Sequence, residues 1–174
     1  MLMRVLGRFA PRAAVATLGL MLMASAGPAA AQDAPRSGTF EALWSLKGTA
    51  QELELGAGRK TSTFRHTGTI TFRNAQGLVG TALASCLGLG DTAKGDLGRC
   101  VWVLEGGDRI FSELSGQLAP GPESGTVRGS FVGGTGRFQQ ISGSYELDWV
   151  VRLTGEPGAF RAQTVRMSGS WKTP

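Results

Sequence analysis

Apolar and polar residues alternate with a period of two over much of the chain, which places successive side chains on opposite faces of a β-strand. In residues 40–47, Phe40, Ala42, Trp44 and Leu46 alternate with Glu41, Leu43, Ser45 and Lys47. The pattern returns at residues 69–73, 145–153 and 160–171. We therefore expect strands at these positions.

A β-hairpin is predicted over residues 99–114. An alternating segment that contains Trp102 leads into Gly106 and Gly107, and the apolar pattern resumes at Ile110. Two adjacent glycines suit the positive φ angles that a tight hairpin turn requires.

The rest of the pattern favours an all-β fold. After Ala31, every ten-residue window with a helical period is broken by glycine, proline or a β-branched run, and 24 of the 143 residues are glycine. Frequent glycine suits a bent, coiled sheet, and closing that sheet removes its exposed edges. We expect a single antiparallel barrel of about eight to ten strands.

The first 31 residues have the pattern of an export signal peptide, which is helical before cleavage. Arg4, Arg8 and Arg12 precede an apolar run, and small residues at 29–31 predict cleavage after Ala31. The expected organisation is therefore a signal peptide at 1–31, a short N-terminal extension at 32–37 and a barrel domain at 38–174, in the periplasm or secreted.

A membrane anchor is the alternative interpretation of the leader. Pro28 interrupts the uncharged stretch, and no stop-transfer cluster of charges follows it. We therefore expect no stable membrane anchor.

Charge argues against a nucleic-acid partner. Without the three leader arginines, the 18 basic residues fall to 15 against 13 acidic ones, a net charge of +2. These basic residues are spaced singly between acids, whereas nucleic-acid binding needs them gathered on one face.

Cys86 and Cys100 are predicted to form a disulfide. An even pair of cysteines in an exported chain is typical of a structural bridge, and closing a loop of about 15 residues is worth about 3 kcal/mol. A redox pair is the alternative, although catalytic dithiols usually lie two residues apart. With His66 as the single histidine, the sequence predicts no metal site.

The sequence predicts no catalytic residue and no cofactor. A serine triad would need His66, but no Gly-x-Ser-x-Gly motif is present. Residues 56–61 are glycine-rich and basic like a phosphate loop, but they lack the Gly-Lys pair and predict a charged hairpin turn. Glu113, Glu146 and Asp148 could supply paired carboxylates, and their spacing selects no pair.

Residues 133–138, Gly-Gly-Thr-Gly-Arg-Phe, followed by Ile141 and Gly143, resemble the signature of the allene oxide cyclase barrel-like and dirigent superfamily. Residues 86–112 are similar to exported bacterial members without an assigned role. The resemblance implies an eight-stranded, calycin-like barrel with an apolar lumen, often as a homo-oligomer. It carries no catalytic residue over to this chain. The same glycines also suit a plain tight turn, in which Arg137 is either a solvated turn residue or the partner of an acid near the barrel rim.

Aromatic residues are the candidates for lining a ligand site. Trp44, Phe72, Trp102, Phe131 and Trp149 belong to strands whose apolar faces converge inside a barrel. The alternative is that these rings simply fill a small core.

Three functions follow as hypotheses. The first is an exported, non-catalytic barrel that binds or shelters a small apolar ligand in the periplasm. The second is an isomerase or cyclase of the allene oxide cyclase type, which requires polar groups inside the lumen; Arg73, Glu113 and Arg128 are the candidates. The third is a structural or interaction module of the cell envelope, marked by an apolar outer patch.

Overall fold

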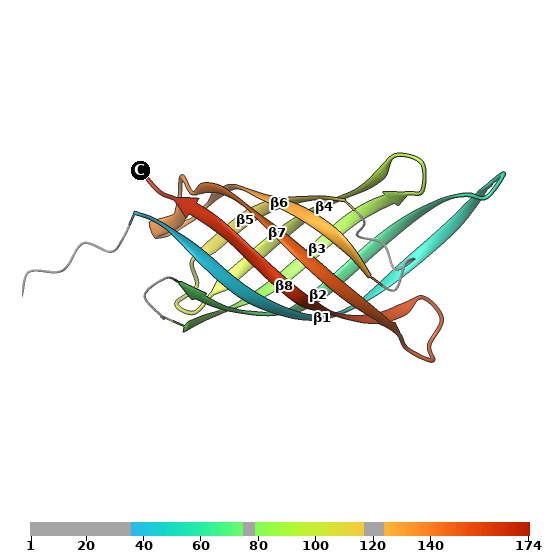
Figure 1. Cartoon of the computed structure of the whole chain (residues 1–174), viewed down its shortest axis with the longest axis horizontal. Helices are drawn as coiled ribbons and strands as arrows, with labels where there is room; N and C mark the ends of the chain where they lie inside the picture. The colour runs from blue at the N-terminus through green and yellow to red at the C-terminus, as the bar shows by residue number, and fades with distance from the viewer. Residues whose placement is uncertain (1–35, 75–78, 117–123) are drawn as a thin grey trace, which may run out of the picture. The chain divides into compact units, whose positions relative to one another are not determined.

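The computed structural model describes residues 36–74, 79–116 and 124–174 of the chain. Their elements are β1 (Ser37–Gly56), β2 (Arg59–Asn74), β3 (Val79–Asp91), β4 (Gly95–Leu104), β5 (Arg109–Gly116), β6 (Ser124–Gly134), the 3-10 turn η1 (Gly136–Phe138), β7 (Ser142–Leu153) and β8 (Ala159–Lys172) (Figure 1). The predicted leader at 1–31, its cleavage site and most of the extension at 32–37 lie outside the described residues.

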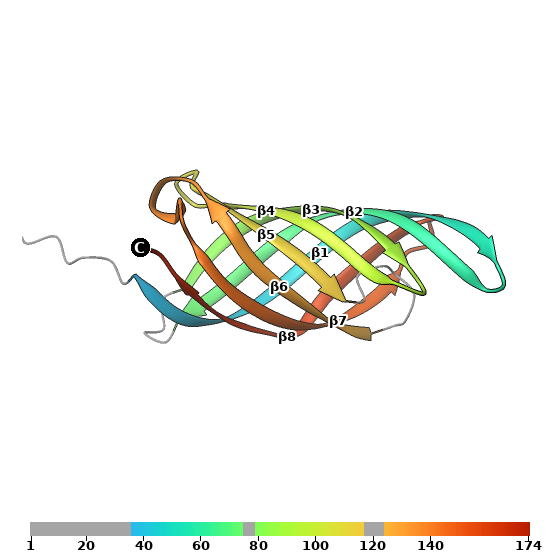
Figure 2. The same ribbon diagram turned by 90° about the horizontal axis from the view of Figure 1, so that it is seen from above.

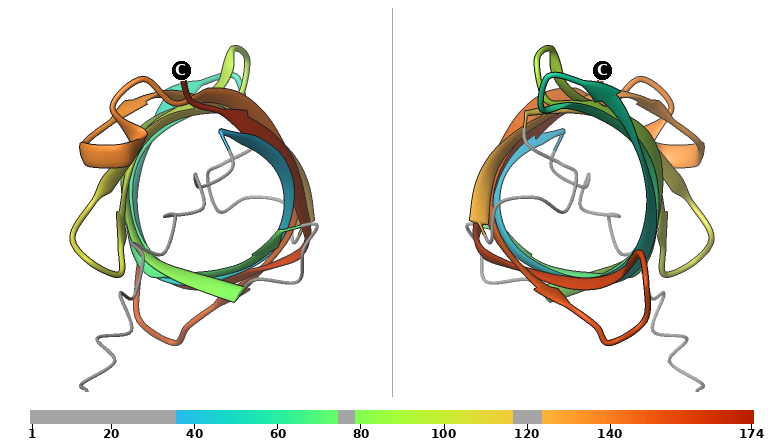
Figure 3. Two further views of the ribbon diagram at one scale, coloured as in Figure 1. Left: turned by 90° about the vertical axis from the view of Figure 1, so that its left-hand side faces the viewer. Right: turned by 90° about the vertical axis from the view of Figure 1, so that its right-hand side faces the viewer.

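The eight strands form one closed antiparallel barrel. Each strand pairs with the next along the chain, and β1 closes the ring by pairing with β8. The ring is visible end-on in Figure 3. In Figure 2 the strands run obliquely to the long axis of the barrel, as closure of a sheet requires. The predicted all-β antiparallel barrel is confirmed, with eight strands.

Alternation along the strands divides the barrel into a buried inner face and an exposed outer face. In β4, buried Cys100, Trp102 and Leu104 alternate with Arg99, Val101 and Val103 on the outside. The largest fully buried side chains are Trp44, Phe160, Ile70, Leu114, Met167 and Val127. One continuous apolar core therefore fills the ring.

Glycines on the inner face make room for aromatic rings on neighbouring strands. Gly88 lies directly opposite Phe64, and Gly129 lies directly opposite Tyr145. A Cβ atom on either glycine would overlap the facing ring. Large and small residues therefore alternate across the core, which lets rings pack inside a narrow barrel.

The strands are longer than the alternation predicts. The strand expected at 40–47 extends through Gly48 to Gly56, and the one expected at 69–73 begins at Arg59 and passes through Gly68. Both internal glycines face inward, where neighbouring backbone and side-chain atoms leave no space for a Cβ. They are packing positions within strands, whereas their sequence suggests breaks.

The hairpin predicted at 99–114 is confirmed. β4 ends at Leu104 and β5 begins at Arg109, and the turn between them has φ angles of 93° at Gly106 and 89° at Gly107. The Leu104 N–H donates to the Asp108 carbonyl over 2.9 Å and closes the turn.

The glycine-rich signature segment forms the connection between β6 and β7. Gly136 has φ 54°, and its turn is η1. Arg137 lies 3.3 Å from the carboxylate of Asp108, which belongs to the neighbouring β4–β5 turn at the same end of the barrel. The segment thus acts as a turn held by an ion pair with an acid at the rim.

Cys86 and Cys100 form the predicted disulfide. The two residues are direct partners on β3 and β4, with Cα atoms 4.2 Å apart, and both are buried. Of the glycines between them, Gly88 and Gly90 lie in β3, and Gly95 and Gly98 lie in β4. The disulfide therefore joins two strands that are already paired.

In the part of the chain that the structure describes, no helix is both long and apolar enough to cross a membrane.

Candidate functional site: a groove across the outer wall

The interior of the described barrel is filled by aromatic rings. The Trp102 ring lies 6.4 Å from that of Trp44 and 5.3 Å from those of Phe131 and Tyr145. A cavity between Trp44, His66 and Trp149 has a volume of about 20 Å³. That volume suits a single water molecule, whereas sites for small molecules start at about 300 Å³.

The polar side chains of the core are few. Two pairs of hydrogen-bonded groups lie within it, whereas the indole N–H groups of Trp44, Trp102 and Trp149 and the Nε2 atom of His66 are buried without a partner among the described residues. The Tyr145 hydroxyl donates to the Ser112 hydroxyl over 3.0 Å, and the Thr164 hydroxyl accepts a hydrogen bond from the backbone N–H of Trp44 over 2.8 Å. Burial raises the pKa of the Tyr145 phenol, so this group stays protonated. These side chains hold the core together and leave no charged group at its centre.

His66 is buried between aromatic rings and the disulfide. Phe64 stacks on it at 5.9 Å, and Trp44 meets it edge-on at 5.3 Å. Burial lowers the pKa of the His66 imidazole to about 4, so the ring is neutral at pH 7. One of its ring nitrogens and the sulfurs of Cys86 and Cys100 lie within 4.8 Å of one another, but bonded sulfurs are not thiolate ligands. The oxidised pair therefore leaves one nitrogen ligand here.

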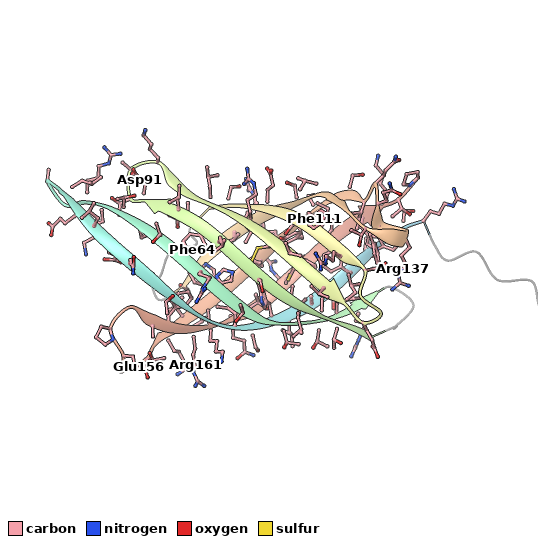
Figure 4. The ribbon with its side chains drawn as sticks, turned by 180° about the vertical axis from the view of Figure 1, so that it is seen from behind. Phe64, Asp91, Phe111, Arg137, Glu156 and Arg161 are labelled. Carbon is pink, nitrogen blue, oxygen red and sulfur yellow. A yellow bond between two sulfur atoms is a disulfide. The ribbon has the colours of Figure 1, made fainter. Side chains whose placement is uncertain are left out.

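A groove of about 980 Å³ crosses the outer wall of the barrel. It follows side chains that are direct register partners on successive strands: Arg161 on β8, Lys47 on β1, Thr67 on β2, Ser85 on β3, Val101 on β4 and Phe111 on β5. The short side chains of Thr67 and Ser85 leave the wall hollow between longer neighbours. Figure 4 looks onto this face, with Glu156 and Arg161 near one end of the groove and Phe111 toward the other.

One end of this outer groove is apolar. Val101 and Phe111 are half-buried side chains, and Val132 of β6 is 55% exposed. Leu87 of β3, 62% exposed, adds apolar surface nearer the middle of the groove. Exposed apolar side chains gathered in a hollow are typical of a binding surface. This end offers a surface for an apolar ligand.

The opposite end of the outer groove is cationic. Lys47, Arg65 and Arg161 line it, and each is exposed. Glu156, in the β7–β8 connection, is the acidic residue among the described residues that line the groove. The cations Lys47 and Arg161 thus lie at the opposite end of the hollow from Phe111 and Val132. Between the two ends, Leu87 lies in register between Arg65 and Arg99, and Arg99 pairs with Glu113 at 3.1 Å.

A second hollow, of about 780 Å³, is lined by residues of β1, β2, β6, β7 and β8 and has a different character. Its outward side chains include Thr39, Ser144, Ser168 and Ser170 together with two arginines and two glutamates. Arg128 and Glu146 pair at 3.3 Å within it. Its balanced charge and hydroxyl-rich lining give it no apolar end.

The candidate ligand-lining residues predicted from sequence lie in the core. Trp44, Trp102, Phe131 and Trp149 are buried there, and Phe72 is partly buried against them. They contact one another rather than a ligand-sized space.

The polar candidates lie on the outer wall. Arg73 and Arg128 are exposed, and Glu113 pairs with Arg99 at 3.1 Å across the outer face of β4 and β5. The inward position that a cyclase requires is therefore found for none of these three residues.

The outer groove itself was missed by sequence reasoning. On β3 the small side chains Ala82, Ala84 and Cys86 face inward, so Leu83 and Leu87 face solvent. The cysteine pair could have indicated this arrangement. Cys100 shares its face with Trp102, and a disulfide places Cys86 on that same inner face, so Leu87 next to it must face outward.

No protein-family model matches this chain, and no curated protein matches it. The described fold and site define a class in physical terms: a closed, eight-stranded antiparallel barrel with a filled interior and an amphiphilic outer groove.

Proposed function

We propose that this protein is an exported, non-catalytic barrel that binds a small apolar molecule in the periplasm, and that the ligand lies in the outer groove. The observation that carries the proposal is the contrast in volume, about 980 Å³ in the groove against about 20 Å³ inside the barrel. The exposed Leu87 and Val132 supply apolar surface in the groove.

The test is a titration of the exported, purified protein with the fluorescent apolar probe N-phenyl-1-naphthylamine. The double variant Leu87→Thr, Val101→Thr places a β-branched residue suited to a strand at both positions and removes apolar contact area. Losing two such contacts costs about 1–3 kcal/mol, so binding weakens roughly 5- to 150-fold.

The matched control is Leu43→Thr, Val165→Thr, which changes two exposed apolar side chains of β1 and β8 that do not line the groove. Its affinity stays within about twofold of the unmodified protein, because the changed side chains lie outside the proposed site. Absence of probe binding, or equal losses in both double variants, would overturn the proposal.

An interaction module of the envelope is a second candidate, favoured by the tip of the β1–β2 hairpin. Residues 51–60 are exposed, and Leu53 at 63% and Leu55 at 48% present apolar surface there. The hairpin tip extends beyond the neighbouring strands in Figure 1. A protein partner at this tip would be lost in Leu53→Thr, Leu55→Thr, whereas probe binding in the groove would not change.

A further inference from the structure

A row of like charges in direct register begins at the cationic end of the outer groove and continues to Arg152, which does not line the groove. Arg152 on β7 lies opposite Arg161 on β8, and Arg161 lies opposite Lys47 on β1. All three side chains are exposed on the outer face. Directly opposed residues of antiparallel strands have Cβ atoms roughly 5 Å apart, and like charges at that distance destabilise the sheet. The arrangement therefore works against folding.

Elsewhere on the same wall, register places arginines opposite acids. Arg99 lies opposite Glu113 and pairs with it at 3.1 Å, and Arg166 lies opposite Asp148 and pairs at 3.0 Å. Arg128 and Glu146 repeat the arrangement at 3.3 Å. The row of like charges departs from this pattern.

The cations of the row have no carboxylate partner among the described residues. Lys47, Arg152 and Arg161 take part in none of the ion pairs that the described residues form. Arg65, which also lines the groove one position diagonally from Lys47, is likewise unpaired there. Three of these unpaired cations, Lys47, Arg65 and Arg161, line one end of the hollow and make a site for an anion, since guanidinium groups bind carboxylates through two parallel hydrogen bonds.

The distance between the two ends defines the ligand further. Lys47 on β1 and Val132 on β6 are separated by five strand spacings, roughly 24 Å at about 4.8 Å per spacing along the wall. A ligand that reaches from the cations to the apolar end therefore has a charged head and a long apolar chain. A compact anion would contact the cationic end alone.

We propose that the outer groove binds a single-chain lipid with an anionic head, a long-chain alkyl carboxylate, with its head at Lys47 and Arg161 and its chain over Val101 and Phe111. The inference rests on the proposed function, because it names the ligand class of the same groove.

Isothermal titration of the exported, purified protein is carried out with hexadecanoate and with hexadecanol, both below their micelle or solubility limits. The comparison distinguishes the contribution of the charged head to binding from that of the alkyl chain. The carboxylate is expected to bind roughly 10- to 100-fold more tightly than the alcohol, as a bidentate charge-assisted contact predicts. In Lys47→Gln, Arg161→Gln this preference falls to within about threefold, while hexadecanol binds as before.

The matched control is Lys94→Gln, Lys172→Gln, which removes two exposed charges that do not line the groove. It keeps the preference for the carboxylate. A readout independent of ligand is thermal unfolding: removing the repulsion in Lys47→Gln, Arg161→Gln raises Tm by about 1–3 °C.

The outcomes are distinguishable. Equal binding of hexadecanoate and hexadecanol would overturn the head-group inference and leave the proposed function standing. Binding of neither ligand nor of the naphthylamine probe would overturn both. Loss of the carboxylate preference in the Lys94, Lys172 control as well would show a general charge effect and overturn the assignment to this row.

Discussion

His66 combines burial, aromatic contacts and a perturbed pKa in a single side chain. It lies between Phe64, Trp44 and Phe160, and burial lowers the pKa of its imidazole to about 4. In the unfolded chain the same group has its ordinary pKa of about 6.5. Between these two values the unfolded state binds more protons than the folded state.

The expected consequence is a loss of stability on acidification. The free energy of unfolding is unaffected by His66 above about pH 6.5 and falls by up to about 1.4 kcal/mol per pH unit toward pH 4, roughly 3 kcal/mol in all. Below about pH 4 both states are protonated and this contribution is constant. Urea unfolding at pH 7, 5.5 and 4 measures the effect.

His66→Phe removes the single histidine of the chain and should flatten the change between pH 6.5 and 4. His66→Gln serves the same purpose with a smaller side chain. Asp91 affects stability only at lower pH, because hydrogen bonds from Arg59 and from the Ala93 and Lys94 N–H groups lower the pKa of its carboxyl to about 2. An unchanged pH dependence in both His66 variants would contradict the assignment.

At the scale of elements, the seam between β1 and β8 has an irregular register. Pairing shifts between Glu41 and Ser45 on β1, and a shift on the β7 side of β8 falls at Thr164. The Trp44 N–H donates to the Thr164 hydroxyl over 2.8 Å. A side chain thus satisfies a buried backbone donor at the place where the ring closes.

Thr164→Val should destabilise the barrel by about 1–3 kcal/mol, because it leaves the buried Trp44 N–H without its partner. Thr164→Ser keeps the hydroxyl and loses one methyl group, at a cost of about 0.8 kcal/mol. Thermal unfolding ranks the two variants, and amide hydrogen exchange at Trp44 accelerates in the valine variant only. A serine variant less stable than the valine variant would contradict this role.

Much of the element order could be predicted from alternation alone. The hairpin at 99–114, the strand through Trp149 and the last strand all follow the period of two, and the cysteine pair predicted the bridge. The lengths of β1 and β2 could not be predicted. Gly48 and Gly68 interrupt the alternating pattern in the sequence, but in the fold they lie inside the strands, where close neighbours leave no space for a Cβ atom.

The outer groove depends on register, which no local pattern encodes. Lys47, Thr67, Ser85 and Val101 come from four strands, and only their pairing places them in one row. The aromatic residues lie in one interior, as their alternation predicts. The space that remains there depends on how the rings pack against the glycines on facing strands, which the sequence does not specify.

At the scale of the whole barrel, a filled interior moves any binding surface to the wall. Rings from neighbouring strands occupy the space that a lumen would need, and the small inward residues of β3 turn its leucines to solvent. The same choice of residues that packs the core therefore creates the apolar half of the outer groove.

Closure between β1 and β8 also brings the two ends of the described barrel together. The Thr173 N–H donates to the Arg36 carbonyl over 2.7 Å, and the Arg36 guanidinium donates to the Pro174 carbonyl over 3.1 Å. In a ring whose strands follow chain order, no strand is topologically first.

A circular permutant that joins Pro174 to Arg36 through a short glycine linker and opens the chain between Gly106 and Gly107 should therefore rebuild the same hydrogen-bonded ring. Its far-ultraviolet circular dichroism spectrum and its bridged cysteines would match those of the parent, because the new ends lie at an exposed turn. The closed ring would then be the same whichever of its eight strands is synthesised first.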